Sequence, residues 1–270
     1  MNQTNLKWDY LINLFLCIGC DKTKERKHNE LKMPRWSRLK QLEIAATSGS
    51  DFLDLLNKGG VQTRQYLRCI HKAALEMGSI THPILPNKLW PKKPRSERRG
   101  ITLEEHRMLH SNMHSWRWKV FLSLLWETGA AQSDAAHFRI EKLQGDILEY
   151  RRMKTGTRAA QKLSPELKTL IENAACGRKK GFILPSLQRM DSKDRGSIFR
   201  RACRRCGVDG VTLHSYRYAW AERAFEAGMP ERLAMVALGH NSAAIHRAYS
   251  KRATVVAPSI EEYRAIVSSS

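Results

Sequence analysis

The segment Leu89–Gly100 places the tightest constraint on how this chain can fold. It reads Leu-Trp-Pro-Lys-Lys-Pro-Arg-Ser-Glu-Arg-Arg-Gly, and its two prolines lack the backbone N–H that a helix requires. Its basic side chains keep it in water or against phosphate groups. Because 270 residues suffice for two modest cores, the segment is predicted to link two domains. The predicted divisions are a helical N-terminal extension over 1–35, a helical domain over 36–90, the linker over 91–100, a larger domain over 101–256 and a tail over 257–270.

The apolar residues before the linker recur with helical spacing. Helices are predicted over Trp36–Ala46, Asp51–Leu56 and Val61–Met77. Three basic residues follow one face of the third helix at a spacing of four: Arg64, Arg68 and Lys72. Such a ridge suits an element that faces a nucleic-acid groove, and it equally suits the solvated face of a small bundle.

Local signals after the linker predict helices around one small sheet. Thr102 and Glu105 stand at the positions of a capping box, which begins a helix, and Ser164 before Pro165 begins another. The stretch 148–157 predicts a β-hairpin with Thr155-Gly156 in its turn. Further helices are predicted over 118–128, 213–227, 230–238 and 242–250. The predicted fold class is therefore mainly α with a small antiparallel sheet (α+β).

The net charge of +21, with an isoelectric point near 10.0, requires a polyanionic partner or many bound counterions. Residues 1–100 carry 19 basic and 9 acidic side chains, and residues 101–270 carry 28 and 17. Both halves are thus equally basic, which favours two domains closing around a DNA duplex. An ordinary RNA-binding or ribosomal protein is the plainer alternative, and charge alone does not exclude it.

The only long apolar stretch, Tyr10–Cys20, is about half the length that spans a bilayer. Asp9 precedes it, and Cys17-Ile-Gly-Cys20 makes a poor signal-peptide cleavage site. A buried helix is favoured over a targeting segment. We therefore expect no membrane association and a cytoplasmic protein, located with the nucleoid when bound to DNA.

Two cysteine pairs have metal-ligand spacing, Cys17/Cys20 and Cys203/Cys206. A zinc site made of two such pairs usually has about 15–20 residues between them, and these pairs lie far further apart. Reduced thiols are the better interpretation, so no metal and no cofactor is expected.

Five residues stand in an order that suits attack on a phosphodiester: Lys154, His214, Arg217, His240 and Tyr249. Such attack needs a nucleophile, which a tyrosine provides, and donors for the non-bridging oxygens, which an arginine fork provides. Histidine moves a proton or donates a hydrogen bond near neutral pH. A lysine near a hairpin tip can reach the leaving oxygen and protonate it.

The individual pieces of this set are weak signals. About one His-x-x-Arg is expected by chance in a chain of this composition, and a second one, His114-Ser-Trp-Arg117, is present. Tyr249 alone would be a half-buried packing residue by default. The joint order and spacing carry the inference.

The ordered set resembles the signature of the tyrosine recombinases, also called the phage integrase family. The resemblance lies in His214-x-x-Arg217, in Leu-Gly-His240 and in a tyrosine nine residues later, with Lys154 in the hairpin motif Met-Lys-Thr-Gly. Val61–Leu67 and the residues that follow it resemble the family's N-terminal helices. Similarity extends over roughly residues 36–255 and is strongest in the last 60 or so.

This resemblance implies a helical core-binding domain plus a DNA breaking-rejoining catalytic domain, closed as a clamp around double-stranded DNA. Tyr249 would form a 3′-phosphotyrosine and release a 5′-hydroxyl, with Lys154 as general acid. Arg217 and His240 would stabilise the transition state, and His214 would assist proton transfer. The family needs no metal, nucleotide or small-molecule substrate, and it acts as a homotetramer on synapsed DNA. Further DNA contacts are expected from Arg64, Arg68, Lys72, Lys92, Lys93 and Arg95.

One position departs from the family pattern. The family carries a catalytic arginine in Thr-Gly-x-Arg-x-x-Glu, where this chain has Ala131, with Asp134 at the acidic position. Arg139 lies beyond the motif and does not match it. Loss of one preorganised donor typically costs about 10²–10³ in rate. Three residues could compensate: Gln132, Arg151 and Arg152. The alternatives are a DNA-binding regulator or relic without catalysis and, less favoured, a type IB topoisomerase.

Overall fold

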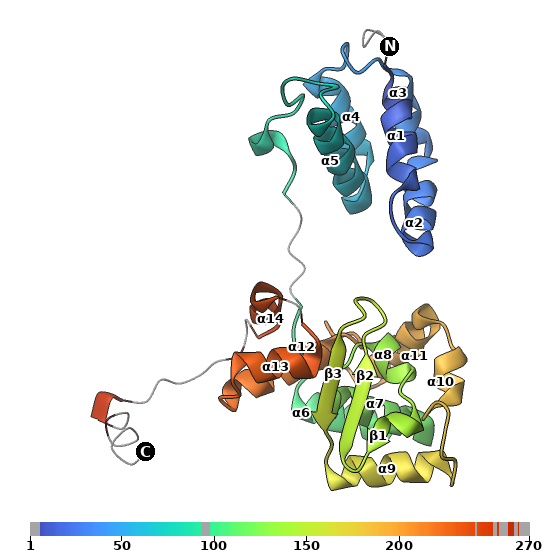
Figure 1. Cartoon of the computed structure of the whole chain (residues 1–270), viewed down its shortest axis with the longest axis vertical. Helices are drawn as coiled ribbons and strands as arrows, with labels where there is room; N and C mark the ends of the chain where they lie inside the picture. The colour runs from blue at the N-terminus through green and yellow to red at the C-terminus, as the bar shows by residue number, and fades with distance from the viewer. Residues whose placement is uncertain are drawn as a thin grey trace. The chain divides into compact units, whose positions relative to one another are not determined.

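The chain folds into two compact units, Met1–Ser96 and Glu97–Ser270, and the boundary between them falls within the predicted linker segment. The computed structural model describes residues 6–92, 98–240, 242–250, 253, 259–261 and 264, without the side chains of Lys22 and Ile245. Each unit has its own hydrophobic core. Figure 1 labels the elements of both.

The regular elements of the first unit, within its described residues, are all helical. Its elements are α1 (Trp8–Cys17), α2 (Asp21–Leu31), the 3₁₀ turn η2 (Pro34–Trp36), α3 (Ser37–Gln41), α4 (Gly49–Lys58), α5 (Val61–Glu76) and the 3₁₀ turn η3 (Asn87–Leu89). Trp8 and Ile12 of α1 lie in the same core as Phe52 of α4 and Leu67 of α5. Residues 6–35 of the segment predicted as an extension therefore pack as part of the same helical unit as residues 36–90.

The helix predicted over Trp36–Ala46 is shorter than expected and ends at Gln41. Leu42 takes an extended conformation, and its carbonyl accepts a hydrogen bond from the Trp8 N–H at 3.2 Å. The Ile44 N–H in turn donates to the Leu6 carbonyl at 2.8 Å. Residues 42–44 thus satisfy their backbone groups by pairing with the entry to α1, which a local helical pattern cannot reveal.

The apolar stretch Tyr10–Cys20, predicted as a buried helix, is helical as far as Cys17, and the helix is buried along one face only. Leu11 and Ile12 are buried, whereas Tyr10 and Leu14 are 51% and 39% exposed. Among the described residues, no helix combines the length and the hydropathy needed to cross a bilayer.

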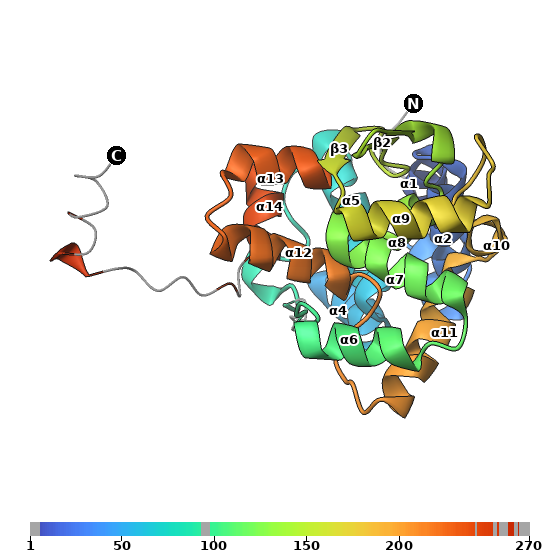
Figure 2. The ribbon, with the colours of Figure 1, turned by 90° about the horizontal axis from the view of Figure 1, so that it is seen from below.

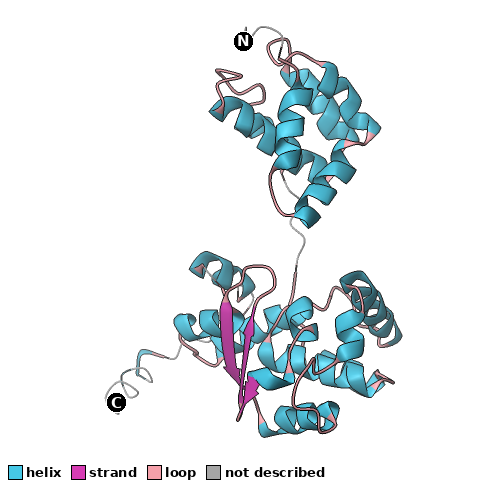
Figure 3. Ribbon diagram, turned by 45° about the vertical axis from the view of Figure 1, so that its right-hand side comes forward, coloured by secondary structure: helices cyan, strands magenta, loops and turns pink. Residues whose placement is uncertain are grey.

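The second unit is a helical body with one small sheet, shown in magenta in Figure 3. Its helices are α6 (Leu103–Asn112), α7 (Trp116–Thr128), α8 (Gln132–Ala136), α9 (Pro165–Ala175), α10 (Pro185–Arg189), α11 (Ser192–Arg205), α12 (Ser215–Glu226), α13 (Glu231–Leu238) and α14 (Ala243–Tyr249), with the 3₁₀ turn η4 (Ile140–Lys142). Strands β1 (Leu143–Gln144), β2 (Ile147–Arg151) and β3 (Arg158–Lys162) form an antiparallel sheet in that order. The predicted fold class is confirmed.

Helix α7 is the centre of this unit. It packs against α6, α9 and α12, and Figure 2 shows it between α6 and α9. Phe121, Leu122 and Leu125 are fully buried in the core. The predicted caps are present: Thr102 accepts from the Glu105 N–H, and Ser164 accepts from the Leu167 N–H.

The β2–β3 hairpin is fixed at its base by one buried side chain. Leu148 pairs with Gln161, and Tyr150 pairs with Ala159. The Gln161 Nε2 donates to the Thr128 carbonyl at 2.6 Å and to the Ala237 carbonyl at 2.9 Å. These carbonyls lie at the C-terminal ends of α7 and α13, so the sheet is tied to both helix ends.

Gly129 ends α7 in the left-handed conformation, with φ of 57°. A Cβ built there would lie 2.7 Å from Trp220 and 2.8 Å from Leu238. Gly129→Ala should destabilise the protein by about 1–3 kcal/mol more than the same change at Gly145, because the added methyl group overpacks the site. Gly145 is the matched control, since its φ is 64° and a Cβ built there would have nothing within 4 Å. Urea unfolding curves of the two variants measure the difference; equal losses would contradict it.

Candidate active site

The structure brings together four of the side chains that the sequence singled out. His214 precedes the first turn of α12, Arg217 lies within it, His240 follows α13, and Tyr249 ends α14. Gly239 takes φ of 60° to end α13, and the His240 N–H then bonds back to the Met235 carbonyl at 2.9 Å. This αL turn directs the chain so that His240 returns toward α12.

The Tyr249 hydroxyl is hydrogen-bonded to the His214 Nε2 at 2.8 Å. Tyr218 stacks on the Tyr249 ring with centroids 4.5 Å apart and an interplanar angle of 26°. No sequence motif marked Tyr218, although it lies four residues after His214 and hence on the same face of α12. The phenol is therefore oriented by a histidine at its oxygen and by a second ring at its face.

Arg217 is completely buried and forms the floor of the site. Its Nη1 donates to the Gly129 carbonyl at 3.0 Å and its Nη2 to the Leu238 carbonyl at 2.6 Å. The guanidinium carbon lies 5.5 Å from the centroid of the Tyr249 ring. Burial, followed by the charge of Arg152, lowers the pKa of Arg217. Within the described residues, its Nε is buried without a hydrogen-bond partner.

His240 is 7% exposed, and its ring centroid lies 4.9 Å from that of Tyr249. Its Nδ1 is 3.2 Å from the Nδ1 of His246, so one imidazole donates and the other accepts. In the described part of the chain, the Nε2 of His240 is buried and has no partner. His246 was not anticipated, although it stands one turn before Tyr249 on the same short helix.

Both active-site histidines favour the neutral form. The pKa of His214 is lowered to about 4 and that of His240 to about 3, mainly by burial and next by the charge of Arg217. Other positive charges that lower the pKa of His214 belong to Arg98, Arg152 and Lys154. A neutral imidazole at the Tyr249 hydroxyl can accept its proton.

Lys154 lies exposed in the turn of the β2–β3 hairpin and makes no hydrogen bond among the described residues. The Gly156 N–H donates to the Arg152 carbonyl at 2.8 Å, and the Arg152 N–H donates to the Thr157 carbonyl at 2.9 Å. These two bonds close the turn. Lys154 is near enough for its charge to lower the pKa of His214, yet it remains outside the group formed around Tyr249.

Ala131 is the partly buried N-cap residue of α8, so no long side chain projects from this position. Asp134 is buried, and its Oδ1 accepts the Met153 N–H at 2.9 Å. Arg139 is turned to Glu141, whose carboxylate lies 2.5 Å away. It therefore does not fill the place of the absent arginine.

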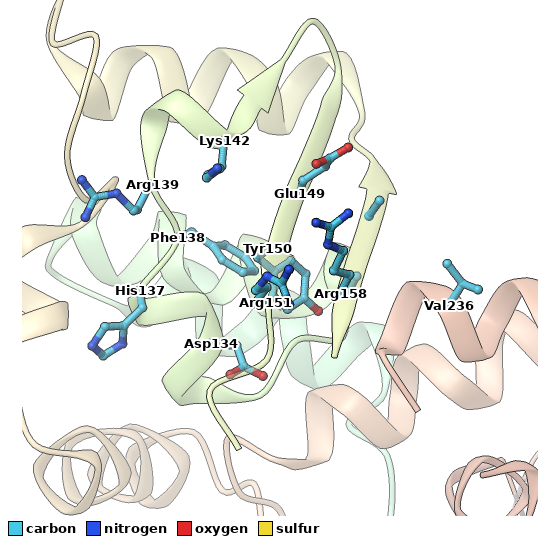
Figure 4. Close-up of a pocket in the computed structure, with 12 residues that line it drawn as sticks. Asp134, His137, Phe138, Arg139, Lys142, Glu149, Tyr150, Arg151, Arg158 and Val236 are labelled. Carbon is cyan, nitrogen blue, oxygen red and sulfur yellow. The ribbon is translucent and has the colours of Figure 1, made fainter. Parts of the chain in front are cut away.

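A basic groove of about 490 Å³ runs beside the sheet. Figure 4 shows Arg151 and Arg158 on paired strands and Arg139 and Lys142 on the segment before them. No sequence motif marked this group, because its members are spread over 20 residues and meet only through the hairpin.

The basic residues predicted on α5 are partly engaged within their own unit. The Arg64 Nη1 donates to the Lys92 carbonyl at 2.8 Å, and the Arg68 Nη2 donates to the Asn87 Oδ1 at 3.3 Å. Lys72 forms an exposed ion pair with Glu76 at 3.3 Å. Lys92 is exposed. Lys93 and Arg95 lie outside the described residues.

The cysteines do not assemble a metal site among the residues that the structure describes, where no cluster of three metal-ligating side chains occurs. Cys203 is buried, and burial raises the pKa of its thiol to about 11. Cys17 and Cys20 are exposed in the other unit.

Comparison with known proteins identifies the family to which the chain belongs. Residues 101–254 match the model of the phage integrase family. The chain therefore belongs to this family, the tyrosine recombinases, as the resemblance predicted. No curated protein sequence matches the chain.

Several solved structures share the fold. One is a lambda integrase dimer bound to a COC′ core site, with 18% sequence identity and a TM-score of 0.74. The match covers 96% of this chain and 81% of the lambda integrase chain. A lambda integrase tetramer bound to a Holliday junction is 18% identical over 96% and 82%, with a TM-score of 0.75. The Tn1549 transposon integrase with circular intermediate DNA is 15% identical over 97% and 99%, with a TM-score of 0.74.

The lowered pKa values predict how the imidazoles titrate. In the DNA-free protein, His214 and His240 should remain neutral from pH 8 down to pH 5 and gain protons only near pH 4 or below. Unfolded histidine titrates near pH 6.5, so the unfolded chain binds more protons below that pH, and the folded state loses stability as the pH falls toward 4. Imidazole NMR signals followed against pH measure this. Tyr249→Phe is the control, because it removes the phenol and keeps the burial; a midpoint near 6.5 for either histidine would contradict the assignment.

Proposed function

We propose that this protein cleaves and rejoins double-stranded DNA through a covalent 3′-phosphotyrosine at Tyr249, as a site-specific recombinase or integrase. The observation that carries the proposal is the 2.8 Å hydrogen bond between the Tyr249 hydroxyl and a neutral His214 beside the buried Arg217. It joins a nucleophile, a base and a positive charge in one place.

The reaction follows from these groups. His214 accepts the phenolic proton while the Tyr249 oxygen forms a bond to phosphorus, and the bond from phosphorus to the 5′-oxygen breaks. Lys154 gives a proton to the departing 5′-oxygen. A 5′-hydroxyl then reverses these steps on the same or another strand, so the phosphoester energy is retained and no cofactor is consumed.

Charge on the phosphate would be met by the two buried groups that lack partners within the described chain, the Nε of Arg217 and the Nε2 of His240. When the His246 Nδ1–H is the hydrogen-bond donor, the His240 Nδ1 is the acceptor. The proton of a neutral His240 then lies on Nε2, where it can donate to a non-bridging oxygen.

DNA as the substrate is supported by the net charge of +21, shared between both units. It is supported also by the DNA-bound relatives, among them the lambda integrase tetramer on a Holliday junction. We infer that this chain acts as a homotetramer on synapsed duplexes. The residues predicted to contact DNA on α5 and the linker remain part of this proposal.

A second candidate is a DNA-binding member of the family without catalysis. Ala131 favours it, because the N-terminus of α8 carries no cationic side chain at this position. The two candidates differ in one product, the covalent protein–DNA adduct.

The first test traps this adduct. Duplexes are selected from a randomised pool by binding to Tyr249→Phe and are rebuilt as a panel with one nick at each position. Wild-type protein should form a protease-sensitive adduct that survives SDS, with phosphotyrosine at residue 249 by mass spectrometry. Tyr249→Phe should bind equally and form none. Tight binding without an adduct on any member of the panel would leave only the second candidate.

The second test concerns Lys154. Lys154→Ala should slow cleavage of ordinary DNA by about 10²–10⁴-fold, as expected when a general acid is lost. A 5′-bridging sulfur at the scissile phosphate should restore the rate, because a thiol, with a pKa of about 8.5, leaves without a proton. Lys162→Ala, which removes an exposed lysine at the far end of the same hairpin, serves as the control. Equal slowing of Lys154→Ala on both substrates would argue against the acid role.

A further inference from the structure

Arg152 directly follows β2, and its side chain turns inward. The side chain is only 12% exposed, although the neighbouring turn residues 153–156 are exposed. Its Nη1 donates to the Gly239 carbonyl at 3.1 Å, a residue 87 positions along the chain. The side chain of Arg152 therefore extends from the hairpin to the turn that positions His240.

Two guanidinium groups hold consecutive carbonyls of this turn. The Arg217 Nη2 bonds to the Leu238 carbonyl at 2.6 Å, and the Arg152 Nη1 bonds to the next carbonyl, that of Gly239. A Cβ at position 239 would lie 2.7 Å from the Arg152 Cδ. The absence of a side chain at Gly239 is thus what allows Arg152 to approach this closely.

Helix α8 supports Arg152 from the other side. The Asp134 Oδ2 lies 3.5 Å from the Arg152 Nε, while its Oδ1 accepts the Met153 N–H. Asp134 stands three residues after Ala131. The segment that lacks the arginine implied by the family resemblance therefore holds a carboxylate against an arginine from the hairpin.

The other two candidates for compensation fit the role less well. Gln132 lines a cavity of about 480 Å³ that His214 also lines, but its side chain carries no charge. Arg151 is exposed, lines the groove of Figure 4, and donates to the Gly156 carbonyl at 3.2 Å.

The positive charges of Arg152 and Arg217 favour the binding of an anion. Its positive charge lowers the pKa of Arg217 and of both histidines, His214 and His240, after the effect of burial. The two guanidinium groups bond to consecutive carbonyls and their like charges repel one another, and the Nε of Arg217 has no partner within the described residues. A phosphodiester between them would relieve the repulsion and accept the unused donors.

We propose that Arg152 is a further catalytic residue, whose guanidinium donates to a non-bridging oxygen of the scissile phosphodiester beside Arg217. It supplies the positive charge that Ala131 cannot, and the inference rests on the proposed strand transfer. Arg152 neutralises the negative charge that develops on the non-bridging oxygens in the transition state.

The test compares cleavage rates of wild type, Arg152→Gln and Arg151→Gln on the nicked duplexes selected above. Arg152→Gln should slow adduct formation by about 10²–10³-fold, the usual effect of losing one preorganised donor. Arg151→Gln, the matched control, should stay within a few-fold of wild type. Arg152→Lys keeps the charge and the aliphatic stem, so its rate of adduct formation should fall between those of the two glutamine variants. If thermal unfolding shows that Arg152→Gln is unfolded, Arg152→Lys takes its place in the comparison.

A methylphosphonate at the scissile position makes the readout specific. This linkage replaces the charged non-bridging oxygen by a methyl group, so little charge remains to be neutralised. The rate difference between wild type and Arg152→Gln should shrink to below tenfold on it. Wild-type cleavage rates for Arg152→Gln, or equal slowing on both linkages, would overturn the catalytic role. No adduct from wild type on either linkage would instead overturn the proposed function itself.

Discussion

The second unit depends on one buried charge, the guanidinium of Arg217. It bonds to the carbonyl of Gly129 after α7 and to that of Leu238 at the end of α13, two helix C-termini that carry partial negative charge. A fully buried arginine is costly unless its donors are occupied. The ends of α7 and α13 must therefore both lie beside this guanidinium. Held there, the guanidinium faces the ring of Tyr249.

Much of this arrangement follows from local sequence. The capping residues Thr102 and Ser164 and the helix-ending glycines 129 and 239 act through neighbours within a few positions, so their pattern predicts them. The long-range contacts that complete the site could not be found this way. Arg217 reaches a carbonyl 88 residues away, and Arg152 reaches one 87 residues away, and no local period records such pairs. The pairing of residues 42–44 with the entry to α1 overrode a helical pattern for the same reason.

The chemistry of the site rests on histidines that stay uncharged. Burial and surrounding cations oppose protonation of His214 and His240, so both imidazoles are neutral at neutral pH. The same positive charges repel one another in the absence of an anion, and a phosphate among them would relieve this repulsion. In the proposed function, attraction for the backbone of DNA and the neutral state of His214 would thus have one electrostatic origin.

The anchoring of the hairpin through Gln161 has a consequence for its opposite end. Its amide is bonded to two helix termini, and at the other end of β2 the Arg152 guanidinium is bonded to the Gly239 carbonyl and the Met153 N–H to Asp134. The hairpin is therefore held near both ends of β2, and Lys154 is the residue directly after the last of these bonds. In the proposed reaction, the backbone that carries the general acid would be held by α8 and by the turn before His240. The proton donor and the groups that bind the phosphate would then be positioned by one hydrogen-bonded frame.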